Sequence, residues 1–158
     1  MNRKENFTIR KAVREDCAQM LGLVHELALF ERAPQEVTVT LEHFEESGFG
    51  KNPVWWGFVA ETEENNGTKI IALAVYYIRY STWKGQTMYL EDLIVTERYR
   101  RFGIGQKLLD ALTQEARDRN LPFIQWQVLE WNEPAILFYK KNNAELDAEW
   151  INCKVSVG

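Results

Sequence analysis

Residues that bind metals or form disulfides are scarce in this chain. It has two cysteines, Cys17 and Cys153, and two histidines, His25 and His43, among 158 residues. The cysteines are far apart in the sequence, and no set of these residues has the spacing of a zinc site. We therefore expect neither a disulfide framework nor a metal centre.

Long apolar runs are missing as well. Hydrophobic residues make up 46% of the chain, yet no stretch approaches the roughly 20 consecutive apolar residues that span a membrane. The first residues, 1–5, are polar and lead directly into a strand-like run, so they do not read as an export signal. These absences predict a cytoplasmic protein that does not enter a membrane.

An excess of basic residues is also absent. The chain has 23 acidic and 19 basic side chains, which gives a net charge of −4. Nucleic-acid binding needs clustered lysine and arginine for phosphate contacts, so we expect no nucleic-acid partner. An acidic protein is better suited to a cationic ligand.

The hydrophobic periodicity predicts one α/β domain that covers residues 1–158. In the first part, a strand at 7–11 precedes a helix that begins near Asp16 and ends near Phe30. A short helix at 41–46 follows, and the glycines and proline at 48–53 predict a loop. Three strands joined by tight turns come next, at 56–62, 69–80 and 87–95, and they predict an antiparallel meander.

The second part alternates helices and strands. A helix at 104–119 precedes a strand at 123–129, a short helix at 133–141 has Pro134 in its first turn, and a last strand covers 150–157. The expected fold is a mixed, mostly antiparallel sheet with helices on both faces.

A glycine-containing loop lies between the strand at 87–95 and the following helix. Its residues are Arg100, Arg101, Phe102, Gly103, Ile104, Gly105 and Gln106. The two glycines allow a sharp turn and a close approach of ligand to backbone. Free amides at the helix start and the helix dipole then favour an anion, and two arginines add positive charge, so a pyrophosphate is the expected occupant.

Two common pyrophosphate ligands do not fit this loop. A dinucleotide fingerprint needs a third glycine where the chain has Leu108, and a nucleoside triphosphate loop needs Gly-Lys-Ser/Thr, which is absent. A turn that binds nothing remains an alternative, because a two-glycine loop by itself has modest specificity.

Further stretches accompany the loop in register from Ile9 to about Trp150. They are Asp16-Cys17, Glu26-Leu27-Ala28, Phe30-Glu31, Gly48-Phe49-Gly50, Tyr80-Ser81-Thr82-Trp83-Lys84-Gly85, Tyr89-Leu90-Glu91-Asp92, Tyr99-Arg100, Trp131-Asn132-Glu133-Pro134 and Phe138-Tyr139-Lys140. This set resembles the GNAT superfamily of N-acetyltransferases, and within it the polyamine (spermidine/spermine) and thialysine acetyltransferases. Phe30 and the 80–85 turn resemble the thialysine branch more closely.

The resemblance implies a fold whose central strand pair splays apart. It also implies acetyl-coenzyme A as co-substrate, transfer of its acetyl group to a small cationic amine, and a homodimer. Acetylation of a protein or peptide amine, and a coenzyme A-binding module without turnover, remain alternatives.

The resemblance also assigns residues to the cofactor. It places the thioester carbonyl near the backbone of Leu93, Ile94 and Val95, which the pattern alone describes as a buried strand end. Asn132 would contact the pantetheine arm, with Pro134, Ala135 and Tyr139 following, although asparagine at this position is also a good helix cap.

Two residues are implied in catalysis. Tyr139 matches the family's general acid, which protonates the coenzyme A sulfur; by pattern alone, a tyrosine on an amphipathic helix is more often a core residue. Glu91 is the expected base, acting through a water molecule, and a charge partner for the amine. Because adjacent strand residues point to opposite faces, we expect Asp92 to be structural.

The expected amine site contains Glu31 as a second acid, although the residue is also a plausible solvated helix-end charge. The other expected contacts are Phe30, Trp83, Gln125, Trp126 and Gln127.

Three features depart from the family pattern. Arg101 and Asn143 stand where glycine is usual, and 145–149 is shortened. Arg101 is costly only if its φ is positive, whereas asparagine tolerates that region.

Overall fold

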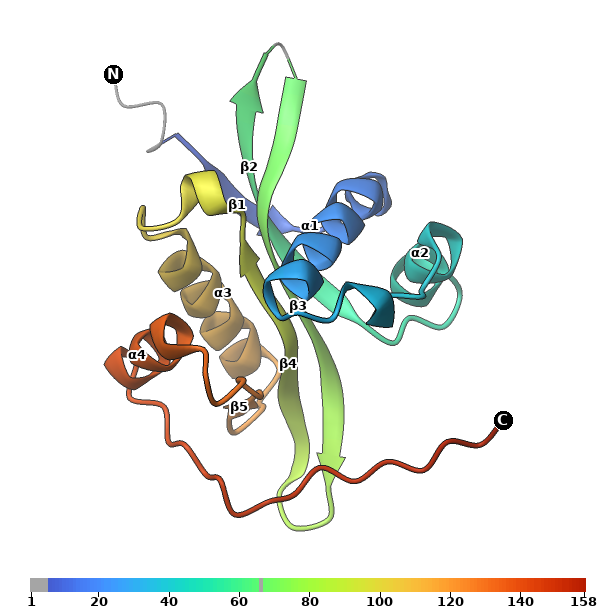
Figure 1. Cartoon of the computed structure of the whole chain (residues 1–158), viewed down its shortest axis with the longest axis vertical. Coiled ribbons are helices and arrows are strands. Elements are labelled where there is room, and N and C mark those ends of the chain that lie inside the picture. Colours follow the sequence, from blue (N-terminus) through green and yellow to red (C-terminus); the bar gives the residue numbers. More distant parts are fainter. Residues whose placement is uncertain (1–5, 66) are drawn as a thin grey trace. The chain divides into compact units, whose positions relative to one another are not determined.

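The computed structural model describes residues 6–65 and 67–158, and the chain divides into two compact units, Met1–Trp126 and Gln127–Gly158 (Figure 1). The first unit contains a five-stranded sheet in the order β1-β2-β3-β4-β5. Its strands are β1 (Thr8–Lys11), β2 (Trp56–Glu64), β3 (Gly67–Ser81), β4 (Gly85–Val95) and β5 (Ile124–Gln125). The first four strands are antiparallel neighbours and β5 joins β4 in parallel, so the predicted mixed, mostly antiparallel sheet is confirmed.

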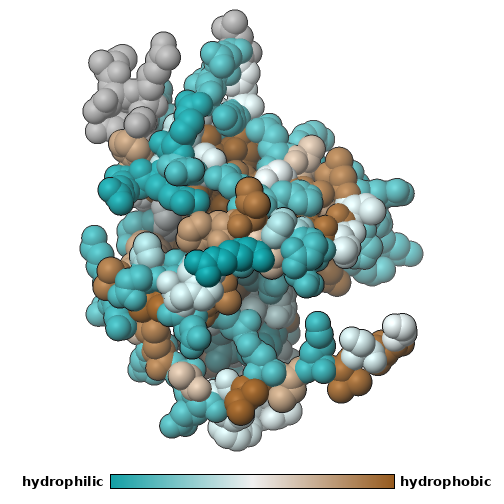
Figure 2. Space-filling model, in the orientation of Figure 1, coloured by the Kyte–Doolittle hydropathy of each residue, from teal (hydrophilic) through white to brown (hydrophobic). Residues whose placement is uncertain are grey.

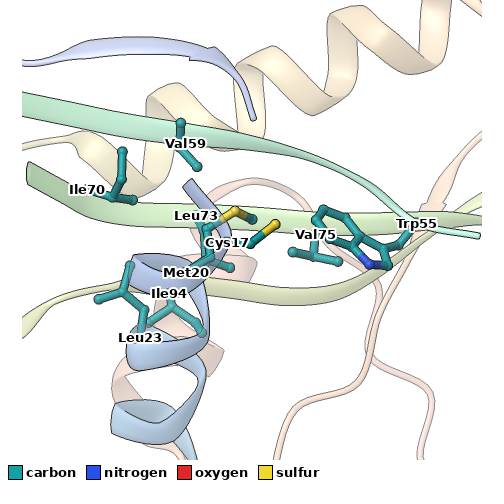
Figure 3. Close-up of a cluster of buried hydrophobic side chains, with 9 residues drawn as sticks. All are labelled: Cys17, Met20, Leu23, Trp55, Val59, Ile70, Leu73, Val75 and Ile94. Carbon is teal, nitrogen blue, oxygen red and sulfur yellow. The ribbon is translucent and has the colours of Figure 1, made fainter. Parts of the chain in front are cut away.

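Helices cover both faces of this sheet, as predicted (Figure 1). On one face are α1 (Cys17–Phe30) and α2 (Leu41–Phe49), and on the other is α3 (Ile104–Asp118). Under α1 a cluster of apolar side chains joins the helix to the strands (Figure 3); it comprises Cys17, Met20, Leu23, Trp55, Val59, Ile70, Leu73, Val75 and Ile94. Each large side chain removed from water in this way contributes roughly 1.5–3 kcal/mol.

Helix α2 runs three residues beyond the predicted end and includes Gly48, which we expected in a loop. Thr40 caps its start by accepting a hydrogen bond from the amide of His43 (3.1 Å). The extension is explained by Trp55, because Phe49 packs edge-on against its ring at 5.4 Å. A side chain at Gly48 would collide with the same ring, so glycine is required inside this helix.

The second unit contains one helix, α4 (Glu133–Lys141), with the predicted bounds. Asn143 follows it with a φ of 62°, so the predicted left-handed turn at this asparagine is confirmed.

Two strand predictions near the C-terminal end fail. Only Ile124–Gln125 of the predicted 123–129 strand is a strand, and 150–157 has no regular secondary structure. Alternation indicated a strand, but a strand also needs a paired neighbour, and 150–157 has none among the described residues. Its apolar side chains are exposed instead (Figure 2): Trp150 by 78%, Ile151 by 85%, Val155 by 86% and Val157 by 96%.

Across residues 6–65 and 67–158, no helix is both long enough and apolar enough to cross a bilayer. The same residues contain no cluster of three or more histidine, cysteine, aspartate or glutamate side chains able to hold a metal ion.

Candidate active site

The chain leaving β4 is fixed by two carboxylates from other elements. Glu26 of α1 accepts hydrogen bonds from the hydroxyl of Thr96 (3.0 and 3.2 Å) and from the amide of Glu97 (3.2 Å). Glu64 of β2 accepts one from the hydroxyl of Tyr99 (3.0 Å). The loop that follows therefore starts from a rigid base.

The glycine loop ends at an open helix start. Gly103 is the residue before α3, with a left-handed φ of 79°, and there is open space where a side chain would stand. The amide of Lys107 donates to the carbonyl of Gly103 (3.1 Å) as the helix begins. The amides of Ile104, Gly105 and Gln106 precede that bond and have no acceptor among the residues described. Such a group of amides, at the positive end of a helix dipole, suits an anion.

The two loop arginines are placed differently. Arg100 donates through Nε to the carbonyl of Val95 (2.9 Å), and its guanidinium lies 5.7 Å from the ring centroid of Phe30. Arg100 thus ties the loop to the end of β4. Arg101 is exposed and has a φ of 69°, so the cost foreseen for a residue replacing glycine is present. Such a conformation costs a non-glycine residue roughly 1–2 kcal/mol. Phe102, between Arg101 and Gly103, is half-buried.

Strand β4 separates from β5 after a short contact. The two strands pair only at Met88 with Ile124 and Tyr89 with Gln125. From Leu90 to Val95, β4 keeps β3 on one side and has no strand partner on the other among the described residues. Ile94 is buried under α1, while its neighbours Leu93 and Val95 are half-buried. This is the splayed strand pair that the family resemblance implied, and it leaves an open row of backbone groups.

A β-bulge interrupts β4 at Glu91. The register passes from Tyr76 opposite Leu90 to Val75 opposite Asp92, so Glu91 has no partner in β3. Opposed residues share a face, and Val75 belongs to the core under α1. Asp92 therefore lies on the α1 face of the sheet.

The charge of Glu91 affects two tyrosines on this face. Burial is the largest cause of the raised pKa of Tyr77, which is two residues from Val75, and the charge of Glu91 raises it further. The pKa of Tyr89, which pairs with Tyr77, is raised by burial, then by Tyr77 and then by Glu91. The expectation that Glu91 and Asp92 point to opposite faces assumed regular alternation, and the extra residue of the bulge breaks that alternation.

Three acids gather at this face. Burial, followed by the charges of Glu91 and Glu31, raises the pKa of Asp92 to about 6. Burial also raises the pKa of Glu31, where α1 ends. Carboxylates that resist ionisation because of burial and like charge are suited to binding an ammonium group.

A sequence model of the family described as Acetyltransferase (GNAT) matches residues 19–143. The chain belongs to this family.

Curated relatives agree with the GNAT assignment over most of the chain. Thialysine N-epsilon-acetyltransferase of Bos taurus is 36% identical over 92% of this chain and 89% of its own length. The Caenorhabditis elegans protein of the same name is 33% identical over 85% of this chain and 81% of its own length. Spermidine/spermine N(1)-acetyltransferase-like protein 1 of Homo sapiens is 33% identical over 87% of this chain, which corresponds to 20% of that longer protein.

Solved structures share the GNAT fold. Aminoglycoside N-acetyltransferase AAC(6')-Iy, in complex with CoA, superposes with a TM-score of 0.76 at 15% identity, over 99% of both chains. At that identity the likeness concerns the fold alone.

The structure does not bring Trp83, the aromatic residue expected at the amine site, next to the acids. Trp83 is 85% exposed. Its amide and that of Lys84 donate to the hydroxyl of Ser81 (both 3.1 Å), which shapes the turn. Glu91 is six residues beyond Gly85, or roughly 20 Å along the strand.

The candidates at the junction of the units have separate environments. Gln125 of β5 accepts a hydrogen bond from Nη1 of Arg79 (3.4 Å). Trp126 is half-buried and ends the first unit. Gln127, in the second unit, donates to the side-chain carbonyl of Asn152 (2.7 Å).

Helix α4 of the second unit carries the remaining candidates. Asn132 accepts a hydrogen bond from the amide of Ala135 (3.4 Å), so its predicted capping role is confirmed, and Pro134 lies in the first turn. Tyr139 is half-buried, with its ring 5.6 Å from that of Phe138. Glu91 and Tyr139 thus belong to different units.

Sequence reasoning missed Asp92, Tyr77 and Tyr89 as members of the acidic face. A tyrosine pair in a β-rich run is indistinguishable from core packing. The available signal was the pair of consecutive acids in an apolar strand. Regular alternation would place one carboxylate on each face of the sheet, and burying a carboxylate is costly, so the pair indicates an irregular strand.

Proposed function

We propose that the protein transfers the acetyl group of acetyl-coenzyme A to a primary amine of a small cationic substrate, such as a polyamine or thialysine. The acidic face formed by Glu31, Glu91 and Asp92 beside an open strand edge carries the proposal. Membership of the acetyltransferase family and the named activities of its relatives support it. Residues 1–158 act as one N-acetyltransferase domain.

Acetyl-coenzyme A is held by backbone more than by side chains. The amides of residues 104–106 take the diphosphate, with Arg101 adding charge and Arg100 holding the loop in place. The pantetheine arm runs along the open edge of β4 at Leu93, Ile94 and Val95, toward Asn132, Pro134 and Ala135. The fit of the diphosphate to the loop is supported by the free amides and by the absence of a side chain at Gly103.

Transfer needs a neutral amine, a polarised carbonyl and two proton movements. The amine nitrogen forms a bond to the thioester carbon, while a backbone amide at the open edge of β4 stabilises the developing oxyanion. Glu91 takes the amine proton through a water molecule. The carbon–sulfur bond breaks, and Tyr139 gives its phenolic proton to the departing sulfur. The approach of Tyr139 to this site is part of the proposal.

The acids also select the substrate. Glu31 and Asp92 bind the ammonium form of the amine before it is deprotonated, with Phe30, Gln125, Trp126 and Gln127 bordering the site. An ammonium group next to Asp92 relieves the like-charge repulsion from Glu91.

The protein acts in the cytoplasm as a homodimer, in keeping with the family resemblance. The exposed apolar side chains of 150–157 support an association between copies. Sedimentation equilibrium distinguishes a dimer from a monomer directly.

The test is thiol release from acetyl-coenzyme A against a panel of diamines, polyamines, thialysine, lysine, aminoglycosides and peptides. We expect turnover with one or more small amines that carry a second positive charge. Turnover with peptides alone would replace the proposed substrate with a protein amine. Tight coenzyme A binding without any turnover would identify a binding module.

A further inference from the structure

Arg79 of β3 lies on the face of the sheet that carries the acids. It is two residues from Tyr77 and four from Val75, whose side chain packs under α1, so all three share one face. Its guanidinium carbon lies 5.7 Å from the ring centroid of Tyr89. Arg79 is therefore held over the neighbouring strand.

Among the described residues, no carboxylate forms an ion pair with the Arg79 guanidinium. Arg10, Arg98 and Arg119 each form an ion pair with a carboxylate. Arg79, among the described residues, has only the ring of Tyr89 and a 3.4 Å hydrogen bond to the amide oxygen of Gln125. The Arg79 guanidinium has five N–H donors in a planar fork, so it can bind a carboxylate in addition to the amide oxygen of Gln125.

Opposite charges stand at the two ends of a tyrosine pair. Tyr77 and Tyr89 are paired across the strands with ring centroids 5.1 Å apart. Both rings feel Glu91 as a negative charge and Arg79 as a positive charge. Positions 79 and 91 are separated by four residue steps along the ladder, or roughly 13 Å between backbones. Side chains that reach inward from both ends leave a span suited to an extended molecule with unlike ends.

We propose that Arg79 is a specificity-determining residue that binds the carboxylate of the acceptor, so that of the two proposed kinds of substrate a diamino acid such as thialysine is preferred over a polyamine. This inference rests on the proposed function. The guanidinium fork pairs with the carboxylate, and the amide oxygen of Gln125 accepts from the α-ammonium group. The side-chain amine then reaches Glu91 and Asp92. A polyamine would instead bring a second ammonium group toward Arg79, which repels it.

Pairs of acceptors that differ only in the carboxylate show its contribution to recognition. Lysine and cadaverine carry the same amine arm with and without a carboxylate, and ornithine and putrescine form a second pair. We would measure KM and kcat for all four at saturating acetyl-coenzyme A in wild type, Arg79→Gln and Arg79→Lys. Arg117→Gln is the control for net charge, because Arg117 is exposed on α3.

We expect wild type to favour the diamino acids. Arg79→Gln should raise KM for them by about 10- to 100-fold, the usual scale for losing a charge-assisted hydrogen bond, with kcat little changed. KM for the diamines should stay constant or fall. Arg79→Lys should recover part of the loss, and Arg117→Gln should behave as wild type.

Other outcomes overturn the inference. Equal losses with lysine and cadaverine would make Arg79 a structural residue that stacks on Tyr89. A wild type that prefers diamines would exclude a carboxylate subsite while leaving amine acetylation intact. Failure of wild type with every amine would instead remove the proposed function itself. Thermal midpoints of the variants separate unfolding from altered recognition.

Discussion

Glu91 and Asp92 are consecutive residues of β4, yet they do not alternate between the two faces as regular strand neighbours do, because Glu91 is the unpaired residue of a β-bulge. The arrangement places two carboxylates beside the open edge of the strand. The ionised form of Asp92 is costly there, first because the carboxyl group is buried and then because Glu91 and Glu31 are its charged neighbours.

The first prediction concerns stability and pH. The pKa of Asp92 in the folded protein, about 6, lies above its ordinary value of 3.8. The folded state therefore holds this proton more tightly, and stability falls as pH rises from about 4 through about 6. Asp92→Asn should raise the free energy of unfolding at neutral pH by on the order of 2–3 kcal/mol. Denaturant titrations between pH 4 and pH 8 check this. A variant less stable than wild type at neutral pH would contradict it.

The second prediction concerns catalysis by the same two acids. Glu91→Gln should lower kcat by about 100-fold, because general base catalysis contributes on that scale. Asp92→Asn should mainly raise KM for the amine. Steady-state kinetics distinguish the two effects, and Glu63→Gln, at an exposed position on β2, is the matched control. If Asp92→Asn kept the wild-type KM for the amine, Asp92 would have a structural role alone.

The third prediction concerns the loop arginine with positive φ. Arg101→Gly should stabilise the protein by about 1 kcal/mol, because glycine adopts this conformation without strain; its greater freedom when unfolded offsets part of the gain. The same change should weaken acetyl-coenzyme A binding by several-fold through loss of a positive charge. Thermal unfolding and calorimetric titration measure the two effects. Arg101→Lys keeps the charge and the strain, and should change neither.

The fourth prediction concerns the proposed acid on α4. Tyr139→Phe should reduce kcat by about 100-fold with little change in acetyl-coenzyme A affinity, since only the proton donor is removed. Phe138→Leu alters the ring packed against it and serves as the control for packing. Unchanged turnover in Tyr139→Phe would remove this residue from the mechanism.

Much of the fold could be predicted because local patterns agree with the final structure. The spacing of Met20, Val24 and Leu27 predicted α1, and Asn132 before Glu-Pro predicted the start of α4. The predicted strand at 87–95 is also present and forms most of β4 (Gly85–Val95). In each case the residues that form the element also determine its contacts.

The missed features depend on partners distant in sequence. The bulge at Glu91 arises from the register between β3 and β4, which alternation within one strand does not reveal. The 150–157 segment has a strand pattern but no strand partner among the described residues. The family resemblance predicted roles for the loop and for Glu91, yet it could not supply the orientation of Asp92 or the stacking of Arg79 on Tyr89.

The two-residue contact between β4 and β5 has a consequence for how ligand and fold depend on each other. An acyl carrier laid along the bare edge of β4 would substitute for the strand that is missing there, satisfying peptide groups that otherwise rely on water. Occupancy should then slow deuterium uptake at residues 90–95 and raise the melting temperature by mass action. The co-substrate would complete the sheet on which it reacts.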